Sequence, residues 1–279
     1  MDPSFYFEKF YRVQDHVLHL INALTTDFYL TGGTALSRGY LHHRFSDDLD
    51  LFVNDDDRFG IWAKEVIEAL QADVNQSVKV LRQEERFARL MVTVGDLPLR
   101  IEMVNDVPAH IGEIITHNVL GRLDSAENIL ANKVTAAIDR NEPKDLADIW
   151  GLCCKMSLPL RPAIHDASSK AAGIFPADLA RVLCSAKAED WQVVQWIDPP
   201  PVFIAPNAKL MAASVNTSGS TFEAASPAAL FQTRIVTGGL AALQTQYAVS
   251  RDGRFLINTQ VDESNTTPIT LILNWKPKP

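Results

Sequence analysis

Two aspartates, Asp48 and Asp50, stand two residues apart in the segment DLDLFV (48–53). The alternation of polar and apolar residues predicts a half-buried strand, in which residues i and i+2 point to the same face. Two carboxylates on one face repel each other unless a cation lies between them. Oxygen ligands suit Mg²⁺ or Mn²⁺, which proteins hold with one or two carboxylates and with substrate phosphates. Taken alone, however, the pair fits a solvent-facing acidic edge better.

Gly32, Gly33 and Thr34 follow a short apolar segment, 28–31, that is predicted to be a strand, and they precede a predicted short helix. Two glycines let the backbone approach a ligand closely and leave N–H groups facing an anion at a helix N-terminus. The Thr34 hydroxyl can add a further contact. Alone this is also an ordinary turn with a helix cap. Together with the two aspartates, it predicts a turn that binds a triphosphate beside carboxylates that bind metal.

A third carboxylate is available on another predicted strand. Glu102 stands between Ile101 and Met103 in LPLRIEMV (97–104). Three carboxylates can hold two metal ions, which activate an attacking oxygen and neutralise a leaving pyrophosphate. Asp48, Asp50 and Glu102 are therefore the predicted metal ligands.

The elements that must position these residues can be predicted from periodicity and turn residues. Amphipathic helices are expected at about 4–24 and 58–72. Strands are expected at 77–83, 87–95 and 97–104, the last two joined by a hairpin at Gly95-Asp96. From Ser125, a predicted N-cap, the pattern becomes helical, and Pro143 begins the next helix. Further helices follow to about Ile197.

Composition limits the class of protein. The chain has 279 residues, 47% of them hydrophobic, and a net charge of -8, which fits one large domain or two small ones. The acidic balance gives no overall attraction to nucleic acid, so a polyanion would need a local patch. No apolar run is long enough to span a membrane and the N-terminus lacks a signal-peptide core, so a cytoplasmic location is expected. The three cysteines lack metal-ligand spacing and are expected in the core.

Two segments carry a family resemblance. GGTAL…HRFSDDLDLF resembles the signature of polymerase-beta-type nucleotidyltransferases, and specifically of the AbiEii/AbiGii toxin family. ENILANKVTAAIDRNEPKDLADIW resembles the second conserved block of that family. The resemblance covers residues 20–195, approximately. It implies an α+β fold, in which a mixed sheet with flanking helices is followed by a helical subdomain.

The resemblance also implies roles for individual residues. Lys133 would reach the nucleotide or its phosphates, Asp148 would lie near the site and orient a base or the acceptor, and Lys144 and Asp145 are weaker candidates. Gly32, Gly33 and Thr34 would bind triphosphate, and Asp48 and Asp50 would bind metal. Glu102 stands where related enzymes often carry Asp. A simpler alternative for the helix is that Lys144 and Asp148, at i and i+4, pair on a solvated face.

A basic cluster lies between the glycine turn and the aspartates. Arg38, His42, His43 and Arg44 could contact phosphate or an RNA acceptor. The alternative is that His42 and His43 end a helix and interact with its dipole.

Three regions are predicted: a catalytic domain at 1–124, a helical subdomain at 125–198, and a small all-β segment at 199–279 that begins at the linker DPPPVF. The last segment resembles the end of a TolB/WD40-like β-propeller. Its roughly 80 residues make at most about two blades, whereas a propeller needs about four to eight, so it is a fragment. It is expected to have no catalytic role, and binding or oligomerisation remains open to it.

The predicted activity is metal-dependent transfer of a nucleoside monophosphate from an NTP to an acceptor hydroxyl. The family resemblance suggests the toxin of a toxin–antitoxin or abortive-infection system, with RNA such as tRNA or a protein as acceptor and with a cognate antitoxin. Two alternatives stay open: nucleotidylation of a small molecule, as in aminoglycoside-modifying relatives, and a non-catalytic NTP-binding module.

Overall fold

The computed structural model describes residues 3–140, 142–186 and 188–200, together with short strand segments within 208–257. The chain divides into two compact units, Met1–Pro200 and Pro201–Pro279. The first unit carries every candidate residue predicted from the sequence. None of the helices in the described residues is long and apolar enough to cross a membrane.

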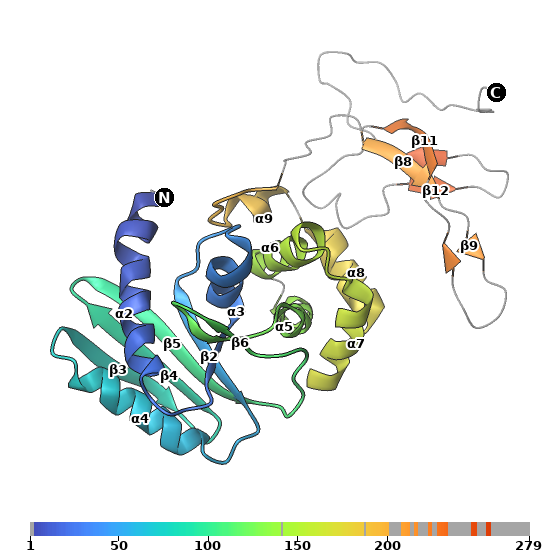
Figure 1. The fold of residues 1–279 in the computed structure, drawn as a ribbon. Coiled ribbons are helices and arrows are strands. Elements are labelled where there is room, and N and C mark those ends of the chain that lie inside the picture. The colour runs from blue at the N-terminus through green and yellow to red at the C-terminus, as the bar shows by residue number, and fades with distance from the viewer. Residues whose placement is uncertain are drawn as a thin grey trace. The chain divides into compact units, whose positions relative to one another are not determined.

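The first unit is built on a seven-stranded mixed sheet with helices on both sides, so its fold is α+β (Figure 1). The strands run in the order β3-β4-β5-β2-β1-β7-β6 across the sheet. Parallel pairs join β2 to β5 and β1 to β7, and the other neighbours are antiparallel. The strands are β1 (Tyr29–Thr31), β2 (Asp48–Asn54), β3 (Gln76–Gln83), β4 (Phe87–Val94), β5 (Leu97–Asp106), β6 (Ile115–His117) and β7 (Gly121–Leu123).

Alternation along β2 separates the core from the site. Leu49, Leu51 and Val53 are buried on one face, and Asp48 and Asp50 lie on the other. The buried face of the sheet packs against α2 (Tyr11–Asn22) and α4 (Phe59–Ala72), whose apolar residues belong to the same core. The strands expected at 77–83, 87–95 and 97–104 and their hairpin are confirmed, whereas the short strands β6 and β7 have no counterpart in the sequence prediction.

The N-terminal helix runs through α1 (Pro3–Phe5), the π-helical η1 (Tyr6–Phe10) and α2. A second continuous helix follows β1, formed by α3 (Gly32–Thr34) and η2 (Ala35–Leu41). His42 adopts a left-handed conformation immediately after it, as expected for a helix C-cap.

Most of the remaining helices pack around α5 (Ala126–Arg140), as Figure 1 shows. The predicted N-cap is confirmed, because the Ser125 hydroxyl accepts a hydrogen bond from the backbone N–H of Asn128 at 3.0 Å. Pro143 begins α6, also as predicted. The others are α6 (Pro143–Trp150), η3 (Gly151–Lys155), α7 (Leu160–Lys170), α8 (Pro176–Ser185) and α9 (Ala188–Gln192).

The end of the first unit returns to the loop that precedes β2. The backbone N–H of Phe45 donates to Gln195, and that of Ile197 donates to His43. The helical part is therefore tied to the segment that leads into Asp48. The prediction that the cysteines lie in the core was wrong, because Cys154 and Cys184 are exposed and Cys153 is half-buried.

In the second unit the described residues form three antiparallel strand pairs. These are β8 (Ala208–Ala212) with β11 (Ala228–Thr233), β9 (Val215–Asn216) with β10 (Glu223–Ala224), and β12 (Tyr247–Val249) with β13 (Phe255–Ile257). Most of the segment that resembles a propeller lies outside the described residues, so that resemblance stays a prediction.

Candidate active site

The parallel register of β2 and β5 brings the three predicted carboxylates together. Asp50 pairs with Glu102, and Asp48 pairs with Arg100 one step away on the same face. This face is the one turned away from the core. The sequence predicted that both strands carry these residues, and the structure adds that the strands are neighbours.

Asp50 carries the least neutralised charge of the three. Its carboxylate makes no hydrogen bond or ion pair within the described part of the chain. Desolvation, followed by the negative charges of Asp48 and Glu102, raises the pKa of Asp50 to about 6. An ionised carboxylate in such surroundings is a strong attractor for a cation.

Asp48 and Glu102 are engaged by arginines. The Asp48 carboxylate pairs with the Arg100 guanidinium, and Glu102 Oε1 accepts a hydrogen bond from Arg89 Nε at 2.9 Å. Among the described residues, no group of three or more His, Cys, Asp or Glu side chains is arranged to hold a metal ion. The three predicted metal ligands therefore lie on neighbouring strands, but their carboxylates are not arranged around one metal position. The chemistry of the three oxygen donors fits a divalent cation that replaces the guanidinium groups.

The glycine turn lies against Asp50. Gly32 has φ +69°, and a Cβ at this position would lie 2.2 Å from Asp50 Oδ2. A side chain there would be strained and would collide with the carboxylate. A Cβ on Gly33 would lie 2.6 Å from Arg44 Nη2, so both glycines are required by close packing. The Thr34 side chain is buried and its hydroxyl donates to the backbone oxygen of Asp48, so this hydroxyl anchors the turn to β2.

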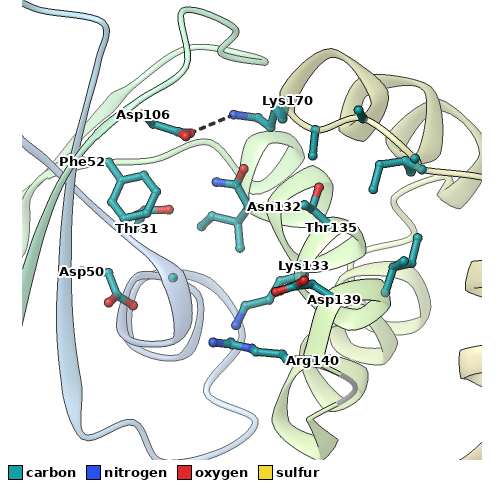
Figure 2. A pocket seen from close by; sticks show the side chains of 18 residues that line it. Thr31, Asp50, Phe52, Asp106, Asn132, Lys133, Thr135, Asp139, Arg140 and Lys170 are labelled. Carbon is teal, nitrogen blue, oxygen red and sulfur yellow. Dashed lines mark ion pairs between the residues drawn. The ribbon is translucent and has the colours of Figure 1, made fainter. Parts of the chain in front are cut away.

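A pocket of about 660 Å³ opens beside Asp50, between the sheet and α5 (Figure 2). Figure 2 shows Lys133 and Arg140 extending from α5 towards the end of the pocket where Asp50 lies. Gly32 lines the same end. Two cations therefore face one carboxylate and the glycine turn, an arrangement that suits a polyphosphate with its metal.

Lys133 is held by two buried carboxylates. Its Nζ lies 2.8 Å from Asp145 Oδ1 and 2.8 Å from Asp148 Oδ2. Burial alone would lower the pKa of Lys133, but Asp148 and Asp145 together raise it above the usual value. The ammonium thus stays charged at the pocket wall. Arg140 Nε pairs with Asp145 Oδ2 at 2.7 Å, which fixes the second cation.

Asp148 lies beside the pocket residue Lys133, but its side chain does not face the pocket. Its side chain is fully buried and is bound by Lys133, by Arg44 Nε at 2.7 Å and by His43 Nε2 at 2.8 Å. Desolvation is outweighed by Arg44 and Lys133, which hold the pKa of Asp148 well below its usual range. Asp148 therefore positions Lys133 and joins the loop before β2 to α6, and does not reach a base or an acceptor.

The basic cluster predicted from the sequence does not form a surface patch. His43 and Arg44 are buried on Asp148, and Arg38 pairs with Asp15 at 2.5 Å. His42 is exposed and caps the helix, which confirms the alternative for this residue. Each of the other three side chains pairs with an aspartate from another part of the chain, and sequence proximity alone could not reveal these partners.

Lys144 pairs with Glu142 at 3.1 Å and not with Asp148, so the proposed i,i+4 pair was wrong. Lys144 does lie near enough to Asp50 to lower the pKa of that carboxylate slightly against the larger raising effects. Asp145 is buried and serves as the common partner of Lys133 and Arg140.

Three arginines at the site were not singled out from the sequence. Arg140 follows Lys133 by seven residues, which places both on one face of α5, and this spacing could have revealed it. Arg100 precedes Glu102 by two residues and so shares its strand face. Arg89 lies opposite Glu102 on β4, and only the strand register reveals that.

Comparison with protein families identifies a match to this chain. A family model described as "Nucleotidyl transferase AbiEii toxin, Type IV TA system" matches residues 20–192, well over half of the chain. The matched range includes the glycine turn, the three carboxylates and all of α5 and α6. Comparison with curated proteins found no match.

Three solved structures with a similar chain path are the following. A Helicobacter pylori protein assigned as a nucleotidyltransferase aligns with 22% identity and a TM-score of 0.41, over 64% of this chain and 76% of that chain. JHP933 from Helicobacter pylori aligns with 23% identity and a TM-score of 0.40, over 66% and 74%. The nucleotidyltransferase toxin MenT4 from Mycobacterium tuberculosis aligns with 22% identity and a TM-score of 0.39, over 65% and 85%.

Proposed function

This chain belongs to the AbiEii nucleotidyl transferase toxin family, and from this premise we propose that it transfers a nucleoside monophosphate from an NTP to an acceptor hydroxyl in a metal-dependent reaction. The acceptor is RNA, for example tRNA, or a protein. Because the family is described as that of a type IV toxin–antitoxin system, a cognate antitoxin is a further partner of this proposal.

The observation that carries the proposal is the environment of Asp50. An unpaired carboxylate with a pKa raised to about 6 lies beside two further carboxylates, against the Gly32 turn and across a pocket from Lys133 and Arg140. A solvent-facing acidic edge would have neither a closely packed glycine nor a cationic opposite wall. The arrangement supports a site for a metal–polyphosphate complex.

Each part has a distinct task in the proposed reaction. The acceptor oxygen forms a bond to the α-phosphorus while the bond from that phosphorus to the bridging oxygen breaks, and pyrophosphate leaves. Lys133 and Arg140 bind the phosphates and neutralise the charge that develops on the leaving group. The proton of the attacking hydroxyl passes to a site carboxylate or to water. Asp48, Asp50 and Glu102 would hold a divalent cation, Mg²⁺ or Mn²⁺, which would supply activation of the attacking oxygen and charge neutralisation.

The test is transfer of label from each of the four α-³²P NTPs, with Mg²⁺ or Mn²⁺, to total RNA, total cell protein and a panel of aminoglycosides. The same reaction with γ-³²P NTPs distinguishes the reaction type, because that label must leave with pyrophosphate. Label from the α position on RNA or protein is the expected result. Label on a small molecule would support the alternative acceptor class, and NTP binding without any transfer would contradict the proposal.

A further inference from the structure

The pocket extends well beyond the residues that the proposed reaction uses. We propose that its far part, between Phe52 on β2 and Asn132 on α5, binds the base of the nucleotide and that Asn132 discriminates among the bases. This inference rests on the proposed function, because it assigns the base end of the same NTP.

The first argument is the order of residues along β2. Asp50 and Phe52 both line the pocket, and Asn54, the next residue on that face, pairs in register with Asp106 of β5. Because a strand rises about 3.3 Å per residue, Phe52 lies about 7 Å from Asp50 along β2. Asn54 and its register partner Asp106 lie about 13 Å from Asp50 in the same direction. A nucleotide whose phosphates lie by Asp50 and Gly32 therefore extends its sugar and base past Phe52.

The second argument is the mixed chemistry of the pocket lining. Besides the charged side chains Lys133 and Arg140 near Asp50, the lining includes the apolar side chains of Phe52, Ile129, Ala172 and Ile174. An apolar surface with an aromatic ring suits the flat face of a base, which stacks favourably on such a ring.

The third argument is the Asn132 amide. It is half-buried, lines the pocket, and has no hydrogen-bond partner in the part of the chain that the structure describes. Figure 2 shows the amide on the pocket side of α5, in the region of Phe52 and the Asp106–Lys170 pair. An amide offers two donors and one acceptor at fixed spacing, which matches the paired donor and acceptor groups on the edge of a base.

An ion pair between Asp106 and Lys170 also lines the pocket. Lys170 Nζ donates to the backbone oxygen of Ala109 at 2.9 Å and lies 3.6 Å from Asp106 Oδ2. The Lys170 side chain is only 4% exposed, so this wall is rigid. A rigid wall limits how far a base can enter the pocket. The hydrogen bonds to Asn132 then depend on which donor and acceptor groups the edge of the base presents.

The experiment measures binding, not transfer, with the full-length protein. Dissociation constants are determined for the Mn²⁺ complexes of ATP, GTP, CTP and UTP, and for inorganic tripolyphosphate, which has no base. The variants are N132A, the isosteric N132D, and N118A, which removes an exposed amide outside the pocket. Unfolding by heat is recorded for each protein.

Wild type and N118A are expected to prefer one NTP over the others. N132A should bind that NTP about tenfold more weakly and lose the preference, since a lost hydrogen bond and an unpaired base edge together cost about 1.4 kcal/mol. Tripolyphosphate should bind equally to all four proteins. N132D should change the preferred base, because it keeps an acceptor and removes both donors. If N132A does not fold, N132D alone tests the proposal through that change.

Two results overturn the base assignment alone: four NTPs bound within twofold of each other by wild type, or unchanged ratios in both Asn132 variants. An equal loss of NTP and tripolyphosphate binding in N132A would also overturn it, by showing that Asn132 acts at the phosphate end. A wild-type protein that binds neither NTP nor tripolyphosphate would overturn the proposed function as well.

Discussion

At the scale of single residues, the site is a set of like charges held close by the strand register and only partly neutralised. Asp48 and Glu102 have guanidinium partners, whereas Asp50 has none in the described residues. Ionising Asp50 therefore costs the folded protein free energy until a cation arrives. A cation bound beside Asp50 would offset this cost.

The first prediction concerns D50N. The pKa of Asp50 is about 6 in the folded protein, against 3.8 for the unperturbed group, so the folded state binds this proton more tightly. The resulting stability is complete below pH 4 and is lost as the pH rises through 6. D50N should therefore be more stable than wild type at pH 7, by on the order of 2 kcal/mol, and this difference should vanish near pH 4. Urea denaturation at the two pH values measures it.

A D50N protein that is less stable than wild type at pH 7 would contradict the account of Asp50. The same pKa also predicts that Mn²⁺ binding strengthens between pH 5 and 7, with a midpoint near 6, because the carboxylate must be ionised to bind.

The second prediction concerns Arg100, which pairs with the Asp48 carboxylate that the proposed cation would bind. R100Q should bind Mn²⁺ roughly two- to fivefold more tightly, in line with the modest strength of a half-exposed ion pair. Isothermal titration calorimetry measures the affinity, with R161Q as the control at an exposed arginine on α7. Weaker Mn²⁺ binding in R100Q would show that Arg100 supports the site and does not compete for it.

At the scale of elements, the turn between β1 and α3 has a backbone conformation that serves the site directly. Gly32 combines a positive φ with contact to Asp50, so the turn and β2 are packed as one unit. G32A should lose NTP binding and about 1 kcal/mol or more of stability. G60A is the matched control, because a Cβ there meets open space on α4 and should leave stability unchanged or slightly higher. NTP binding by G32A at the wild-type affinity would contradict this role.

Two variants of the buried ion-pair network on α5 and α6 should affect stability and transfer differently. D148A should cost about 3–5 kcal/mol, because it leaves Arg44 and Lys133 buried with too little negative charge. K133M should cost less, since Asp145 keeps Arg140 and Asp148 keeps Arg44, yet it should abolish transfer. Chemical denaturation and label transfer on both variants test this. A K133M protein that transfers label normally would remove Lys133 from the mechanism.

Local patterns in the sequence predicted much of this arrangement. Alternation predicted β2 and β5, the glycine pair predicted the turn, and the caps at Ser125 and Pro143 predicted where α5 and α6 begin. Predictions based on neighbouring residues were wrong where a side chain pairs with a residue far away in the sequence. His43 and Arg44 precede the aspartates and suggested a basic surface, but their partner, Asp148, lies more than 100 residues away. Likewise, no local pattern could show that Asp50 and Glu102 are register partners.

At the scale of the whole molecule, the first unit contains every residue assigned to the reaction, and the chain divides at Pro200. A protein that ends at Pro200 should therefore fold, bind NTP and keep label transfer within about twofold of the full chain. Circular dichroism and the transfer assay measure this. Loss of transfer by a folded, NTP-binding protein would assign residues 201–279 a role in engaging the acceptor.

The net charge of -8 also bears on the acceptor. An acidic chain gives no long-range attraction to RNA, so binding of an RNA acceptor must rely on local contacts near the pocket. Transfer to RNA should accordingly depend less on salt than the binding of a strongly basic protein would.

The central claim is that Asp50 is part of the catalytic site, and one measurement tests it most directly. Single-turnover transfer of α-³²P label to the acceptor is compared for wild type, D50N and D57N, the last removing an exposed carboxylate just after β2. D50N should be slower by about a hundredfold or more while remaining folded, and D57N should match wild type. Transfer by folded D50N at the wild-type rate would contradict the account and place the chemistry elsewhere in the molecule.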